Sequence, residues 1–282
     1  MCDFDTDNDM QKAAAISRRK FGALSLGAGL AAMLPPVANA AETSEAEVTI
    51  KTPDGNCDAH FVYPKSGASA AVLVWPDVFG LRDGFRTMGR RLAESGYAVL
   101  TVNPFYRVKK APTSTGTAFT PDLQGMMGAL TETTHVTDAK AFVAWLDAQP
   151  QVDKKRKIGT TGYCMGGPIV MRTVGNIPER VGAGATFHGG GLNSAAANSP
   201  HLLIPKMKAS MLICIADNDD QKDPTSKDIL RKAFDAAKVP AEIEVYKGSQ
   251  HGWCAIDTGA YNKELAEKAW ARQLELFRKA LA

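Results

Sequence analysis

A cysteine takes the place of a nucleophile in a short glycine-rich segment, Gly162–Gly167, whose sequence is Gly-Tyr-Cys-Met-Gly-Gly. The spacing is that of the G-x-S-x-G nucleophile elbow, with Cys164 where serine usually stands. An elbow is a strained strand-to-helix turn, and its glycines leave room for close backbone approach. A thiol also needs a base or a positive field to ionise, and the N-terminus of the following helix supplies part of that field. The segment predicts a nucleophilic Cys164; the alternative is a small buried cysteine in a glycine-rich turn.

Strands and helices alternate around this segment, as an α/β fold requires. An apolar run at 70–75 predicts a strand that is buried on both faces, and residues 98–102 and 157–161 predict two more buried strands. Residues 182–187, 210–215 and 242–246 predict further strands, and residues 47–51 and 58–63 predict an antiparallel hairpin. Helical periodicity is present at 82–95, 131–149, 165–174, 226–237 and 261–281. We therefore expect one domain, a mostly parallel sheet with helices on both faces. Residues 107–127 are rich in Pro, Thr, Ser and Gly and predict a long loop.

Polar residues follow several of these strands, at the sheet edge where α/β proteins bind ligands. His251 follows the last strand, and an aspartate-rich segment follows the strand before it. The order nucleophile, acid, histidine is that of the α/β-hydrolase triad. Asp217 and Asp219 could each reach the histidine, and spacing does not choose between them. His188 comes before the acid in the chain, so we expect it to line the pocket.

The α/β-hydrolase fold also predicts where an oxyanion would be held. The donors are the N–H that follows the nucleophile and one after an earlier strand, here Met165 and Val78. Each such donor stabilises a tetrahedral intermediate by roughly 3–4 kcal/mol. The alternative to a catalytic His251 is a histidine that lies in a surface loop and takes no part in the chemistry.

Composition excludes several other classes of protein. The net charge of +3 over 282 residues is small and scattered, so we expect no nucleic-acid partner. The cysteines, Cys2, Cys57, Cys164, Cys214 and Cys254, form no C-x-x-C pair and no zinc spacing, so we expect no structural metal site. The proposed chemistry implies no metal and no organic cofactor. Sequence does not pair them into disulfides.

The first forty residues have the three parts of a secretory signal. Arg18 and Arg19 precede Phe21, an apolar Ala/Leu/Gly run extends to Leu34, and Ala38-Asn39-Ala40 is an A-x-A cleavage site. The paired arginines favour the twin-arginine route, with the twin-arginine translocase as a transient partner. We expect a signal at 1–40, a mature domain at 41–282, a periplasmic location and no stable membrane insertion after cleavage. The alternatives are an uncleaved anchor or a chance basic pair.

The chain resembles the dienelactone hydrolase (carboxymethylenebutenolidase) family over nearly the whole mature region. Gly162–Gly167 matches the family elbow, and Ser249–Trp253 matches its histidine segment. Asp217-Asn218-Asp219 followed by Pro224 resembles the acid loop, and this alignment selects Asp219. The resemblance implies a Cys164–His251–Asp219 triad that opens a small lactone or ester through an acyl-thioester.

The resemblance also implies two residues that contact substrate. Asp77 stands where the family has a glutamate that helps to activate the cysteine, and Arg107 matches an arginine that binds the substrate carboxylate. A second family arginine is missing, since residues 254–256 are Cys-Ala-Ile. Alternatives are therefore a general esterase or thioesterase for small exported metabolites, or a non-catalytic thiol sensor or binding protein on the same scaffold.

Overall fold

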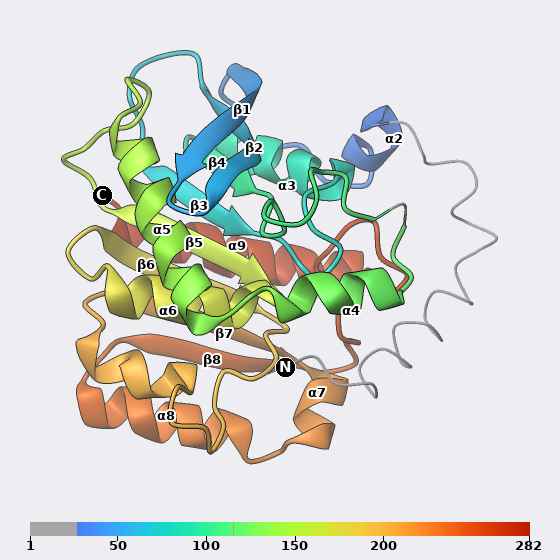
Figure 1. Ribbon diagram of the computed structural model, residues 1–282, viewed down its shortest axis with the longest axis vertical. Coiled ribbons are helices and arrows are strands. Elements are labelled where there is room, and N and C mark those ends of the chain that lie inside the picture. The colour runs from blue at the N-terminus through green and yellow to red at the C-terminus, as the bar shows by residue number, and fades with distance from the viewer. Residues whose placement is uncertain (1–26, 115) are drawn as a thin grey trace.

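An eight-stranded sheet forms the centre of the protein in a computed structural model that describes residues 27–114 and 116–282 (Figure 1). Along the sheet the strands lie in the order β1-β2-β4-β3-β5-β6-β7-β8. The first two pairings, β1 with β2 and β2 with β4, are antiparallel, and all the others are parallel. The strands are β1 (Thr43–Thr52), β2 (Gly55–Pro64), β3 (Ala71–Trp75), β4 (Ala98–Val102), β5 (Ile158–Tyr163), β6 (Val181–Phe187), β7 (Ser210–Ala216) and β8 (Ala241–Tyr246).

Helices cover both faces of this sheet, which explains why the central strands are buried throughout. One face packs against α5 (Glu132–Asp147), α6 (Gly166–Asn176) and α8 (Ser226–Ala237), and the other against α3 (Asp83–Glu94) and α9 (Lys263–Ala280). Every residue of β3, β4, β5 and β6 is buried. The predicted α/β-hydrolase architecture, the N-terminal hairpin and the strand-helix alternation are confirmed.

The predicted long loop at 107–127 is wrong in its second half, where the chain forms α4 (Pro121–Gly128). The hydroxyl of Thr120 caps the helix by accepting from the Leu123 N–H, and Pro121 occupies the first turn. Threonine followed by proline is a helix start signal, which the polar composition of the surrounding segment obscured. A second short helix, α7 (Asp217–Lys222), follows β7 and carries the aspartate-rich segment.

The predicted signal segment is described only in part. The twin-arginine pair Arg18-Arg19 lies outside the described residues. Further along, α2 (Gly27–Ala31) packs Leu30 against α3, and Ala38–Ala40 is exposed and lacks regular structure. No helix among the residues placed in the structure is both long and apolar enough to cross a membrane.

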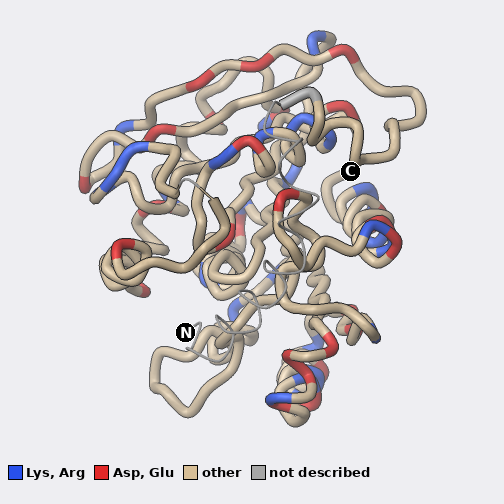
Figure 2. The backbone as a smooth tube through the Cα atoms, turned by 90° about the vertical axis from the view of Figure 1, so that its right-hand side faces the viewer, with Lys and Arg blue, Asp and Glu red and all other residues tan. Residues whose placement is uncertain are grey.

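Charged residues of both signs are mixed over the face that the carboxyl ends of the parallel strands point toward. Figure 2 turns the right-hand side of Figure 1 to the viewer and shows Lys and Arg interspersed with Asp and Glu. The thiols of Cys57, Cys214 and Cys254 are all buried, and none of them is bonded to another described cysteine.

Candidate active site

Cys164 lies at the tip of a sharp turn between β5 and α6. Its φ of +51° is in the left-handed region, and its N–H donates to the Phe187 carbonyl at 3.0 Å. A Cβ on Gly162 would lie 2.3 Å from the Gly166 carbonyl oxygen, and a Cβ on Gly166 would lie 2.4 Å from the Trp75 carbonyl oxygen. Both flanking glycines are therefore required by close backbone approach, as an elbow demands.

An aspartate orients the ring of His251. The His251 Nδ1 and Asp219 Oδ2 atoms are 2.7 Å apart. The backbone N–H of His251 donates to the side-chain oxygen of Asn218 at 2.8 Å. Asp219 belongs to α7, so a short helix positions the acid. His251 itself is buried. The imidazole therefore has its acid partner on one side of the ring.

The neighbouring aspartates have other partners. Asp217 accepts from Lys247 Nζ at 2.9 Å and from the Gly248 N–H at 3.0 Å. Asp220 accepts from Lys227 Nζ at 2.6 Å. Of the two aspartates that spacing left open, it is Asp219 that contacts the histidine.

A second histidine packs against the first. The ring centroids of His188 and His251 are 4.9 Å apart, and the two ring planes make an angle of 69°. The ring centroids of Trp253 and His188 are 5.3 Å apart. The pKa of His188 is held well below its usual range, mainly because the ring is buried and secondly because His251 lies nearby. His188 is therefore a neutral wall of the site, consistent with its predicted place.

The two predicted oxyanion donors lie beside the cysteine. Val78, Cys164 and Met165 belong to one buried apolar cluster, together with Phe79 and Phe105. α4 completes this cluster with Leu123 and Met126. The side chains of Val78 and Met165 thus pack in the same cluster as Cys164, and this packing holds the backbone that carries the two N–H groups.

A buried ion-pair network links the segment after β3 to the segment after His251. The Arg82 guanidinium binds both oxygens of Asp77, at 2.6 and 2.9 Å, and both oxygens of Asp257, at 2.8 and 2.9 Å. The Asp77 Oδ1 atom also accepts from the Phe79 N–H. A Cβ on Gly84 would lie 2.2 Å from the Asp257 carboxylate, so the glycine makes room for the network. Activation of the thiol by Asp77 would require its pair with Arg82 to open.

Replacement of Arg82 by methionine is expected to lower the free energy of unfolding by about 3–5 kcal/mol, because two buried carboxylates would lose their shared cation. Urea unfolding of the purified variant measures the loss. Arg86→Met is the matched control, one turn further along at the start of α3, since its partner Glu47 is exposed and such pairs contribute about 1 kcal/mol or less. Equal losses in the two variants would show that the network is not a special source of stability.

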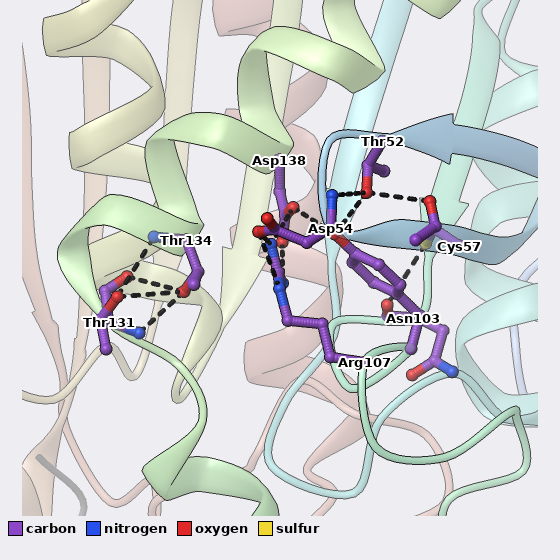
Figure 3. Close-up of polar contacts among 10 residues, drawn as sticks. Thr52, Asp54, Cys57, Asn103, Arg107, Thr131, Thr134 and Asp138 are labelled. Carbon is purple, nitrogen blue, oxygen red and sulfur yellow. Dashed lines mark hydrogen bonds and ion pairs between the residues drawn. The ribbon is translucent and has the colours of Figure 1, made fainter.

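Arg107 is also surrounded by carboxylates (Figure 3). Its Nη1 and Nη2 atoms donate to Asp138 on α5 at 2.8 and 2.7 Å, and Nε and Nη2 donate to Asp54 in the β1–β2 turn at 3.1 and 2.5 Å. The Tyr106 hydroxyl donates to the same Asp138 at 2.7 Å. The arginine thus lies in a cluster with a net negative charge, which does not favour the predicted contact with a substrate carboxylate.

Comparison with known proteins identifies the family. The model of the dienelactone hydrolase family matches residues 57–281, which include the elbow, the acid helix and the histidine segment. The chain belongs to the dienelactone hydrolase family. Its homologues indicate a hydrolase that acts on ester or lactone bonds.

Relatives of this dienelactone hydrolase family member share its length. A Methylorubrum extorquens protein, provisionally named a carboxymethylenebutenolidase, is 28% identical to this chain, and the alignment covers 96% of this chain and 97% of that protein. The carboxymethylenebutenolidase of Rhodococcus opacus is 24% identical over 77% of this chain and 83% of its own. A Klebsiella pneumoniae protein provisionally named a dienelactone hydrolase superposes with a TM-score of 0.75, at 23% identity and with 84% of this chain and 99% of its own covered, which supports the fold.

Sequence reasoning missed three parts of this dienelactone hydrolase site. It missed Arg82 and Asp257, whose pairing joins residues 175 positions apart, and Asp138, the carboxylate on Arg107. It also missed the α4 side chains over Cys164, although Thr120-Pro121 was a usable signal for that helix.

Proposed function

We propose that this protein hydrolyses a carboxylic ester or lactone through a covalent acyl group on Cys164. The observation that carries the proposal is the 2.7 Å contact between His251 Nδ1 and Asp219. This contact orients the imidazole, and the family resemblance implies that His251 is the base. The elbow geometry of Cys164 supports the nucleophile. A sensor that only reacts through its thiol has no need of an oriented acid.

In the first half-reaction, the Cys164 thiol gives its proton to His251 Nε2 and its sulfur attacks the substrate carbonyl carbon. The N–H groups of Val78 and Met165 stabilise the oxyanion of the tetrahedral intermediate. As this intermediate collapses, the C–O bond breaks and His251 returns the proton to the leaving oxygen. An alcohol, or the hydroxyl end of an opened lactone, departs and a thioester remains.

In the second half-reaction, His251 takes a proton from water, and the hydroxide attacks the thioester carbonyl. The C–S bond then breaks, the sulfur regains a proton and the carboxylic acid leaves. Asp219 stabilises the imidazolium that forms in both halves. No electrons are transferred to or from the protein, so the cycle balances with water as the co-reactant.

Mass spectrometry of the purified mature protein, quenched during turnover of a panel of lactones and aryl esters, tests this mechanism. We expect an acyl adduct on the peptide that contains Cys164 and none on the peptides that contain Cys57 or Cys214. Turnover with an adduct on another residue, or with no adduct under conditions that trap thioesters, would contradict the proposal.

We also propose that the protein is exported by the twin-arginine route to the periplasm. The support is the three-part pattern of residues 1–40 and the exposure of Ala38–Ala40, which leaves the cleavage motif open to a peptidase. Protein recovered from the periplasm is expected to begin at Ala41, and replacement of Arg18 and Arg19 by lysine is expected to retain it in the cytoplasm. Periplasmic protein that keeps residues 1–40 would disprove cleavage.

A further inference from the structure

The structure assigns a neutral, apolar acyl group to the substrate, held over Cys164 against the inner side of α4. This inference rests on the proposed function and adds the chemical class of the substrate. It follows from the side chains that cover the thiol, from the pairing of the nearby guanidinium groups and from the construction of α4.

Apolar side chains from separate segments converge on the cysteine. Phe79 follows β3, Phe105 follows β4, and Leu123 and Met126 come from α4; all are buried in one cluster with Cys164. Cys164 is only 2% exposed under this cover. An acyl group that reaches the thiol must therefore replace apolar contacts, and an apolar group does so without the cost of an unpartnered polar atom.

The two guanidinium groups near these segments are already paired with carboxylates. Arg107, two residues after Phe105, binds two carboxylates, and so does Arg82, three residues after Phe79. Each cluster of one arginine and two aspartates has a net negative charge. A substrate carboxylate would meet repulsion from both clusters and would lose its hydration without gaining a cation.

The position of the missing family arginine supplies no replacement. Cys254, Ala255 and Ile256 are buried and pack in the core cluster that includes α9. They offer neither a positive charge nor a hydrogen-bond donor on a side chain long enough to reach a carboxylate. This region of the chain therefore favours a neutral substrate as well.

α4 has the form of an apolar wall. Leu123 and Met126, three residues apart, are its buried side chains, while Pro121, Asp122 and Gln124 are exposed. A Cβ on Gly125 or Gly128 would have no atom within 4 Å, so the outer side of the helix carries no packing. The helix contributes to the site through its two inward apolar residues, and these should determine the acyl preference.

A matched pair of substrates tests the inference: p-nitrophenyl butyrate, which is neutral, and p-nitrophenyl hemisuccinate, which ends in a carboxylate at a similar length. We expect kcat/KM for the butyrate to exceed that for the hemisuccinate by at least about 100-fold. The ratio is independent of the fraction of folded enzyme. A ratio near one, or one that favours the hemisuccinate, would overturn the inference.

Two variants of α4 assign the preference to its inner side. Leu123→Arg places a cation in the buried cluster that contains Cys164 and is expected to lower the butyrate/hemisuccinate ratio by at least about tenfold. Gln124→Arg adds the same charge on the exposed side of the same helix and is expected to leave the ratio unchanged. Equal ratios in both variants, or a fall in the Gln124 variant alone, would remove α4 from the argument.

The outcomes also separate this inference from the proposed function. If neither ester acylates Cys164 and hydrolysis still occurs, the acyl-enzyme mechanism fails. If both esters acylate Cys164 at equal rates, the mechanism holds and the assignment of an apolar substrate fails.

Discussion

Cys164→Ala is expected to lower kcat by about 10⁵-fold or more, to the level that binding and the oxyanion donors alone provide. The thiol is the proposed attacking group, and alanine removes it while adding no bulk to the apolar cluster around it. Initial rates on a neutral aryl ester, measured with the variant and the parent protein at the same concentration, provide the comparison.

The matched control is Cys57→Ala, which also removes a buried thiol. Cys57 lies on β2, and its Sγ donates to the Asn103 carbonyl. This variant is expected to keep its activity, with only the stability loss of a small core truncation. Comparable thermal unfolding of both variants would show that the loss of rate is chemical. Retained turnover in the Cys164 variant would exclude it as the nucleophile.

Asp219→Asn is expected to lower kcat by roughly 10⁴-fold with little change in fold. The asparagine amide can occupy the same space, but it cannot stabilise an imidazolium, and its N–H₂ group favours the wrong ring tautomer of His251. Steady-state kinetics on the same ester measure the effect, and the rate of thiol alkylation reports independently on the ability of His251 to accept the Cys164 proton.

Asp217→Asn provides the control for that variant. Asp217 is two residues earlier in the same helix, but its carboxylate binds Lys247 and the Gly248 N–H instead of the histidine. Its side chain lies outside the proposed triad, so we expect a change in kcat of less than about threefold, in line with an exposed ion pair. If the Asp217 variant lost activity and the Asp219 variant kept it, the assignment of the acid would be reversed.

Three features of the charged residues point in one direction. Asp77 is paired with Arg82, Arg107 is paired with Asp138 and Asp54, and residues 254–256 carry no arginine. Each feature leaves one charged group fewer that could bind or respond to an anionic substrate. The chain thus combines an elbow turn with charged residues that are already paired with one another.

The local features of the fold could be predicted from sequence because each is encoded within a few residues. Apolar runs determine the buried strands, and Gly162 and Gly166 mark the elbow since only glycine permits the close backbone approach there. The place of His251 after the last strand followed from the same pattern. Where local composition was misleading, as around α4, the expected loop was wrong in its second half.

The partners of the charged groups were decided only by the tertiary structure. Which aspartate contacts His251, which carboxylates enclose Arg107, and the pairing of Arg82 with Asp257 all depend on segments brought together by the sheet order. Coulombic pairing acts through space and leaves no periodicity in the chain. The sequence by itself therefore determined the hydrolase scaffold and its elbow segment. The three-dimensional arrangement decided which charged groups are paired at the proposed site, and hence the substrate class that we infer.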